Sequence, residues 1–343
     1  MRRAGVGVVY LVHGTFVGED LGGLLTELGR FFPGARDSLA AIARRLLEST
    51  LADRGLYTTE YVRRLSKTLN ADGEPPIEVR LFGWTGENHH LGRADAAVRL
   101  LDELATLDDA DGNPRAPEGR VLLWGHSHGG NVFAILTHLL SGDSAAVDDF
   151  FHAARWHYRI PWFGSCDLPV WERAHERLRG GSPIVRRPLD FVTFGTPLRY
   201  GWHPAGFAKL LHFVNHRPLD PNDRLRAVAP SSVNDVLQAA GGDYIQQFGI
   251  AGTNLPPNLL LWRAWLSDRR LGALLQPPEL TMLNAWERIK LGRRVPQAGQ
   301  TLLVDYGPES TNIADHWAGH AVYTRNAWMA FHVAETARAL YDA

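Results

Sequence analysis

Residues 121–136 read VLLWGHSHGGNVFAIL and form the segment that best indicates the fold of the chain. Val121–Trp124 is an unbroken apolar run, which is typical of a strand buried on both faces of a sheet. Asn131–Leu136 continues as an apolar run that fits a buried helix. The residues between them, GHSHG, must therefore turn the chain sharply from a strand into a helix, and Ser127 lies at the tip of that turn.

The same alternation of apolar runs and helical spacing extends along the chain, and it is typical of a parallel sheet with helices on both faces. The predicted strands are Val6–Val12, Ile77–Phe82, Val121–Trp124, Leu189–Phe194, Leu210–Val214 and Leu302–Val304. The predicted helices are Ser38–Arg54, Arg93–Leu107, Ser127–Leu140 and Tyr323–Leu340. We expect an α/β fold with a mostly parallel sheet of about six strands, in one domain over residues 1–343.

Two long stretches do not follow this alternation. Residues 141–188 and 231–300 contain no clear strand and are rich in aromatic side chains. Structureless loops of this length are uncommon in compact domains, so we expect both stretches to be largely helical insertions. Each would be either a lid or cap over a site, or ordinary peripheral packing.

The composition excludes several functional classes. With 36 basic and 37 acidic residues, the chain has no charge excess for nucleic acid or for an anionic membrane surface. The single cysteine, Cys166, excludes an internal disulfide and a thiolate metal cluster.

The sequence also bears on location. No apolar run approaches the length that spans a bilayer, so no transmembrane segment is expected. The apolar run Gly5–Val12 after Arg2 and Arg3 is short and has no cleavage site, so it does not fit a signal peptide. We therefore expect a cytoplasmic protein, or one exported by a route that needs no such signal.

A second motif follows the first predicted strand. His13, Gly14 and Thr15 end that strand about 110 residues before the serine turn. Acyl transfer needs backbone N–H groups that already point at the oxygen that becomes negative. We expect these donors to be the N–H of His128, directly after the serine, and the N–H of Thr15, with Phe16 as the alternative.

The serine turn and the His-Gly-Thr strand end together resemble the α/β-hydrolase superfamily, and more narrowly bacterial lipases and carboxylesterases. The segment VTFGTP at Val192–Pro197 is similar to the strand that follows the serine helix in lipase-like members. The resemblance covers roughly residues 5–140, 189–225 and 300–340, and neither insertion. It implies Ser127 as the nucleophile, followed along the chain by an acid and then by a histidine.

The resemblance places the acid after the second strand beyond the serine turn. Asp220 and Asp223 both follow Leu210–Val214, and Asp220 is preferred because it lies nearer the strand and precedes a proline. Asp190 lies at the beginning of its strand and would therefore lie at the wrong end of the sheet. Asp305 and Asp315 are weaker alternatives near the last strand.

The resemblance places the histidine between the last strand and the last helix. His316 and His320 both lie there. His320 is preferred because it is nearest the start of the helix and because Gly319 would let the loop approach the serine.

These residues lead to an expected function. Ser127, Asp220 and His320 would hydrolyse carboxylic esters, lipid-like ones in particular, through an acyl-enzyme, with no cofactor and no metal. The partner would be a small-molecule or lipid ester, and the sequence leaves the oligomeric state open. The same three residues would also serve an amidase, a thioesterase, an acyltransferase or a phospholipase, and a hydrolase fold can persist in a binding protein without catalysis.

Overall fold

The computed structural model describes most of the chain. The described residues are 1–15, 57–71, 75–110, 119–160, 166–180, 185–197, 199–218, 235, 238–250, 256–257, 259, 261–275, 296–307 and 318–342.

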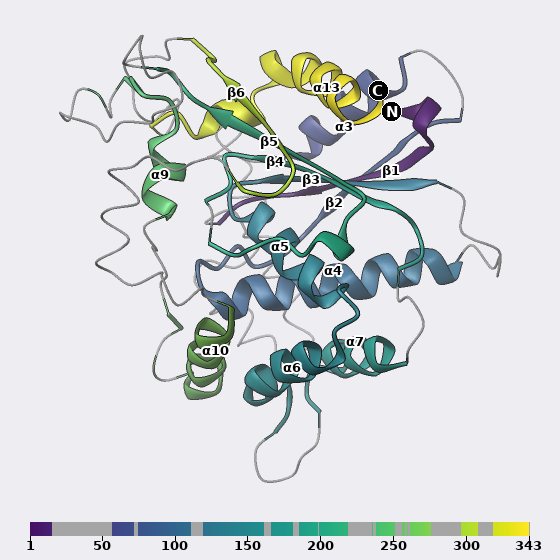
Figure 1. Cartoon of the computed structure of the whole chain (residues 1–343), viewed down its shortest axis with the longest axis vertical. Coiled ribbons are helices and arrows are strands. Elements are labelled where there is room, and N and C mark those ends of the chain that lie inside the picture. The colour runs from purple at the N-terminus through teal and green to yellow at the C-terminus, as the bar shows by residue number, and fades with distance from the viewer. Residues whose placement is uncertain are drawn as a thin grey trace.

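One six-stranded parallel sheet forms the centre of the structure (Figure 1). Its strands lie side by side in the order β2-β1-β3-β4-β5-β6, and every neighbouring pair is parallel. The strands are β1 (Val6–Val12), β2 (Glu78–Phe82), β3 (Arg120–His126), β4 (Leu189–Phe194), β5 (Lys209–Asn215) and β6 (Gln300–Val304). All six correspond to predicted strands, so the predicted α/β architecture with a parallel sheet is confirmed.

Helices cover both faces of this sheet (Figure 1). On one face lie α3 (Thr59–Leu69) and α13 (Asn326–Tyr341), and on the other lie α4 (His90–Ala110) and α5 (Gly129–Leu139). Each face has its own apolar core, and the side chains of β1 alternate between them: Tyr10 and Val12 join one core, and Val9 and Leu11 the other. Burial on both faces explains why the strands are nearly continuous apolar runs.

The two predicted insertions are helical where the structure describes them. The first contains α6 (Ser144–Tyr158) and α7 (Pro169–Arg179), and the second contains α9 (Tyr244–Ile250) and α10 (Trp262–Leu275). Helix α6 packs against α7 and α10, and α7 and α10 pack against α4, so the three helices form an outer layer on that side of the sheet (Figure 1). A lid or cap role of either insertion stays a prediction, as does a role in peripheral packing alone.

The helices differ from the sequence prediction near the N-terminus. The predicted helix Ser38–Arg54 lies outside the described residues, whereas α3 was not predicted. Among the described helices, none has the length and apolar character needed to cross a bilayer.

Because all strands are parallel, their carboxyl ends meet at one edge of the sheet. The residues that follow these ends form the candidate site, which agrees with the general rule for open α/β sheets.

Candidate active site

Ser127 is held in a strained turn between β3 and α5. Its φ is 53°, in the left-handed region that residues other than glycine rarely adopt. Its N–H donates to the carbonyl of Phe194 at the end of β4 (2.8 Å), and its own carbonyl accepts from the hydroxyl of Thr196 (2.9 Å). The neighbouring strand thus fixes the turn on both sides of the serine, and such stored strain is characteristic of functional positions.

The end of β1 lies directly against this serine. A Cβ added to Gly14 would come within 2.6 Å of Ser127 Cβ and 3.1 Å of its Oγ, so only glycine allows this approach. The imidazole of His13 stacks on Trp84, with ring centroids 5.6 Å apart, and the indole N–H donates to the carbonyl of His13 (2.9 Å). Trp84 therefore fixes the backbone of the strand end that faces the serine.

The expected N–H donors lie in these two segments. His128 caps α5 and is buried, while Thr15 follows Gly14 and is partly buried. Within the described part of the chain, neither N–H donates a hydrogen bond to another residue. The alternative donor, Phe16, lies outside the described residues. The arrangement leaves two backbone donors beside Ser127 for a developing negative charge.

His320 is paired with a buried carboxylate. Its Nδ1 lies 2.7 Å from Oδ2 of Asp243, and both side chains are buried, with Asp243 fully so (0% exposed). The same carboxylate accepts from the hydroxyl of Tyr323 (3.1 Å) and from the N–H of Gln246 (2.8 Å). Three donors fix Asp243, and Asp243 in turn fixes the ring of His320.

The end of β5 brings these two residues together. Asn215, the last residue of β5, accepts from the N–H of Asp243 through its carbonyl (3.0 Å). Its amide donates to the carbonyl of Gly319 (2.9 Å), directly before His320. A Cβ on Gly319 would come within 2.3 Å of the carbonyl of Gly242, so this glycine lets its loop approach the segment of Asp243. From the sequence, Gly319 was instead predicted to allow an approach of its loop to the serine.

The imidazole of His320 lies beside the serine turn. His126, the residue before Ser127, donates from Nε2 to the carbonyl of His320 (3.1 Å), and the two rings are 4.6 Å apart. Nε2 of His320 is buried and has no hydrogen-bond partner among the described residues. Since Nδ1 is held by Asp243, Nε2 is the nitrogen that remains to accept a proton.

His128, on the other side of Ser127, is fixed as a neutral imidazole. The amide nitrogen of Asn131 donates to the carbonyl of Pro197 (2.9 Å) and also to Nδ1 of His128 (3.0 Å). Burial, followed by the charges of Arg93 and Arg199, lowers the pKa of His128 well below its usual value. At neutral pH this ring is therefore a neutral hydrogen-bond donor through Nε2.

The structure brings together Ser127, His128, Thr15 and His320, and it pairs His320 with a carboxylate that was not among the predicted candidates. The sequence prediction was Asp220, with Asp223 as the alternative, and both lie outside the described residues. The carboxylate in contact with His320 is that of Asp243, which the sequence analysis did not single out. The alternative histidine, His316, also lies outside the described residues.

Of the other aspartates that were considered, Asp190 and Asp305 are engaged elsewhere, and Asp315 lies outside the described residues. Asp190, the second residue of β4, binds Arg120 at the start of β3, so its expected place at the opposite end of the sheet is confirmed. Asp305 is bound to Arg217 (3.1 Å) and to the N–H of Gly307.

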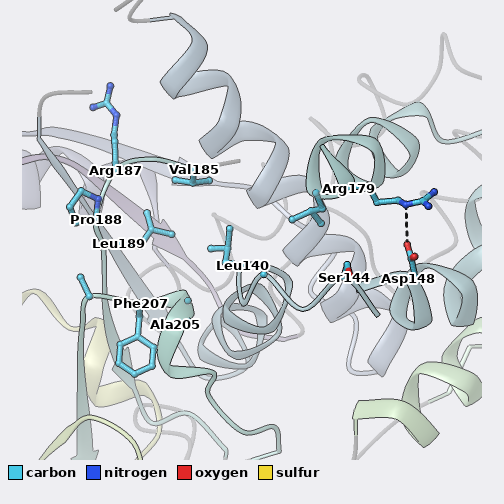
Figure 2. Close-up of a pocket in the computed structure, with 14 residues that line it drawn as sticks. Leu140, Ser144, Asp148, Arg179, Val185, Arg187, Pro188, Leu189, Ala205 and Phe207 are labelled. Carbon is cyan, nitrogen blue, oxygen red and sulfur yellow. Dashed lines mark ion pairs between the residues drawn. The ribbon is translucent and has the colours of Figure 1, made fainter. Parts of the chain in front are cut away.

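A surface pocket of about 770 Å³ does not coincide with this site. It is lined by Leu189 at the start of β4 and by Leu140, Arg187 and Phe207 (Figure 2). It therefore opens at the amino end of the sheet, away from Ser127. Among the described residues, no group of three or more histidine, cysteine, aspartate or glutamate side chains is arranged to hold a metal ion.

Comparisons of the chain with family models, with curated proteins and with solved structures found no match. The function must therefore be inferred from the geometry of Ser127, His320 and Asp243.

Proposed function

We propose that this protein is a serine hydrolase of the α/β-hydrolase fold, which cleaves carboxylic esters through an acyl-enzyme on Ser127. The observation that carries this proposal is the buried pair of Asp243 and His320, which lies beside a strained serine with its second ring nitrogen available. Chain order also supports it, because the serine, acid and histidine follow one another as they do in α/β-hydrolases.

His320 is the proposed general base. It takes the proton of the Ser127 hydroxyl as the oxygen attacks the ester carbonyl, and it later gives that proton to the leaving alcohol. Asp243 keeps the proton of the neutral ring on Nδ1 and stabilises the imidazolium when it forms. Water then attacks the acyl-enzyme while His320 takes its proton, and His320 returns that proton to Ser127 as the carboxylic acid leaves.

The N–H groups of His128 and Thr15 are the proposed oxyanion hole. Their positions at the start of α5 and after β1 put two fixed dipoles beside the serine, and the amino end of α5 adds a favourable field. In the structure no hydrogen bond joins Ser127 to Nε2 of His320. Such catalytic contacts commonly tighten only when substrate is bound.

The apolar character of the substrate rests on the aromatic insertions, whose apolar side chains pack in the same core as those of α4. Amides, thioesters and acyl transfer to another alcohol would use the same acyl-enzyme, so they are the alternative reactions at this site. A binding protein without catalysis is the alternative of a different class.

A labelling experiment separates these alternatives. A fluorescent alkyl phosphonate should label wild type covalently and should not label Ser127→Ala, whichever acyl group the enzyme prefers. Turnover of 4-nitrophenyl esters of graded acyl length should then show which chain is preferred. Equal labelling of wild type and Ser127→Ala, or no labelling of either, would contradict the proposed nucleophile.

A further inference from the structure

Two buried arginines lie at the same edge of the sheet as Ser127. Arg93 is in the first turn of α4 and Arg199 follows the end of β4. Arg93 is fully buried and Arg199 is 3% exposed. Charged side chains are rarely buried to this extent unless a partner compensates them, because desolvation of an unpaired charge is costly.

The described hydrogen bonds of Arg93 are to neutral groups. Its Nε donates to the hydroxyl of Tyr200 (2.9 Å) and its Nη1 to the side-chain carbonyl of Asn88 (3.0 Å). The hydroxyl of Tyr200 donates onward to Nδ1 of His90 (2.8 Å). Burial, followed by the charge of Arg93, lowers the pKa of His90, so this ring is neutral and accepts that bond. These contacts fix the position of Arg93.

Arg199 has unused donors. Its Nε and Nη1 are buried and have no hydrogen-bond partner among the described residues. Burial, followed by the charge of Arg93, lowers its pKa to about 10, so it remains a cation at neutral pH. Asp268 is the carboxylate whose charge reaches Arg199, but one oxygen of Asp268 already accepts from the N–H of Leu91 (2.9 Å).

The two cations lie within electrostatic reach of His128, the residue that follows the nucleophile. His128 feels the charges of both Arg93 and Arg199. Hydrogen bonds also connect these groups. The side-chain amide of Asn131, in the first turn of α5, donates to His128 and to the carbonyl of Pro197, two residues before Arg199. The strand order agrees with this placement. Ser127 follows β3, and β3 lies between β4, which leads to Arg199, and the side of the sheet with β1 and β2, where β2 leads to Arg93.

We propose that Arg199, supported by Arg93, binds an oxyanion carried by the ester substrate, so that this enzyme acts on esters with a phosphate or carboxylate near the scissile bond. This inference rests on the proposed ester hydrolysis and narrows its substrate class. An oxyanion would accept hydrogen bonds from the unused N–H donors of Arg199 and would compensate its buried positive charge. Guanidinium groups are well suited to this task because they remain charged and hold planar donors in fixed directions.

Matched substrates test the proposal. The phosphate pair is 1-hexanoylglycerol and 1-hexanoylglycerol-3-phosphate, which differ only in the phosphate and can be used below their micelle concentrations. The carboxylate pair is the mono-4-nitrophenyl ester of adipic acid and its methyl-capped diester. For each pair, the preference is the ratio of kcat/KM for the anionic ester to kcat/KM for the neutral ester.

Wild type should prefer the anionic member of at least one pair by roughly ten- to a hundred-fold, the range for a charge-assisted hydrogen bond in a buried site. Arg199→Gln should lower this preference about ten-fold or more, and Arg199→Lys, which keeps the charge, should recover part of it. Arg338→Gln removes an exposed arginine paired with Glu335 and should leave the preference unchanged. The pair with the larger preference identifies the oxyanion as phosphate or carboxylate.

Binding of inorganic phosphate provides a readout that does not depend on the choice of ester. Phosphate should inhibit wild-type hydrolysis of the neutral ester competitively, and Arg199→Gln should need at least about ten-fold more phosphate for the same inhibition. If Arg199→Gln does not fold, Arg199→Lys and the wild-type preference decide the question.

Failure of this inference differs from failure of the proposed function. A wild type that hydrolyses both members of each pair equally and is insensitive to phosphate would overturn the oxyanion subsite while leaving the serine hydrolase intact. A wild type that is no more active than Ser127→Ala on any ester and is not labelled by the phosphonate would overturn the hydrolase itself.

Discussion

Asp190 and Asp243 are both fully buried aspartates at the sheet, but they lie at opposite ends of it. Asp190, at the amino end, receives two charged hydrogen bonds from Arg120 (2.6 and 2.7 Å) and one from the hydroxyl of Tyr341 (2.7 Å). Asp243, at the carboxyl end, receives one from an imidazole, His320, and two from neutral donors.

The two carboxylates are therefore compensated in different ways. The guanidinium of Arg120 is permanently charged, and its hydrogen bonds to Asp190 raise its pKa further, so this pair cannot exchange a proton at any physiological pH. The partner of Asp243 can gain or lose a proton, and its second nitrogen is available. A buried aspartate thus indicates structure when its partner is arginine, and chemistry when its partner is a histidine that faces a nucleophile.

The largest expected effect is on catalysis by Asp243→Asn. The amide cannot stabilise the imidazolium of His320 and favours the wrong ring tautomer, so kcat for an ester should fall about 10⁴-fold. Steady-state kinetics on the preferred 4-nitrophenyl ester, with a melting curve of the same sample, would measure this. A loss below about ten-fold in a folded variant would show that Asp243 is not the acid.

Asp190→Asn should show the reverse pattern. Removing the charge leaves Arg120 partly buried without its ion partner, so the free energy of unfolding should fall by about 3 kcal/mol. Ester hydrolysis well below the melting temperature should stay close to wild type, because Asp190 lies at the amino end of the sheet. Urea unfolding and kinetics on the same preparation would test both statements. A large catalytic loss with normal stability would mean that the two ends of the sheet are not independent.

Gly195→Ala tests how closely the carboxyl end is packed. Gly195 has φ 56°, and an added Cβ would come within 2.4 Å of the Tyr323 ring and 2.6 Å of Asp243 Oδ2. Displacement of this carboxylate should misalign His320 and lower kcat about a hundred-fold. Steady-state kinetics at a temperature where the variant is fully folded would measure the loss.

Gly142→Ala is the matched control for this substitution. Gly142 also has a positive φ, of 80°, but a Cβ there meets nothing within 4 Å. It should cost about 1 kcal/mol of stability from backbone strain and leave kcat unchanged. Equal activity of the two variants would argue against a positioning role for the packing around Asp243.

Much of the fold could be predicted because the strands are buried on both faces. Apolar runs located all six strands, with every predicted end within two residues of the observed end. Helix α3 was missed although a local signal exists, since the hydroxyl of Thr58 caps it by accepting from the N–H of Tyr61 (3.1 Å). Tyr61 and Leu65, one turn apart, are its buried residues, so a cap followed by two apolar positions was the available pattern.

The site could be predicted only where sequence position determines it. Ser127 and His320 lie at junctions between strands and helices, which the apolar pattern locates. Asp243 follows no strand, and it reaches His320 through hydrogen bonds to Asn215 and the close contact of Gly242 with Gly319. Such contacts join residues far apart in the sequence, 77 positions for Asp243 and His320, so periodicity does not reveal them. The burial of Arg199 is equally a product of tertiary packing.

The smallest expected effect concerns a buried histidine away from any carboxylate. His332 in the middle of α13 is fully buried against Phe194 and Phe213, and its Nε2 bonds the hydroxyl of Tyr306 (2.8 Å). Burial lowers its pKa to about 3 in the folded protein, whereas an unfolded imidazole titrates near 6.5. Between these pH values the unfolded chain takes up a proton that the folded chain does not.

This one residue should therefore make the free energy of unfolding fall by up to about 1.4 kcal/mol per pH unit as the pH drops from 6 to 4. The neutral variant His332→Gln should remove that part of the slope, as measured by urea unfolding at a series of pH values. His152→Gln, at an exposed position on α6, is the control that removes an imidazole without removing a buried one. An unchanged slope in His332→Gln would show that His332 is protonated in the fold. A buried imidazole could then carry a charge at this sheet without a carboxylate. The pairing of Asp243 with His320 would then no longer distinguish a catalytic aspartate from a structural one such as Asp190.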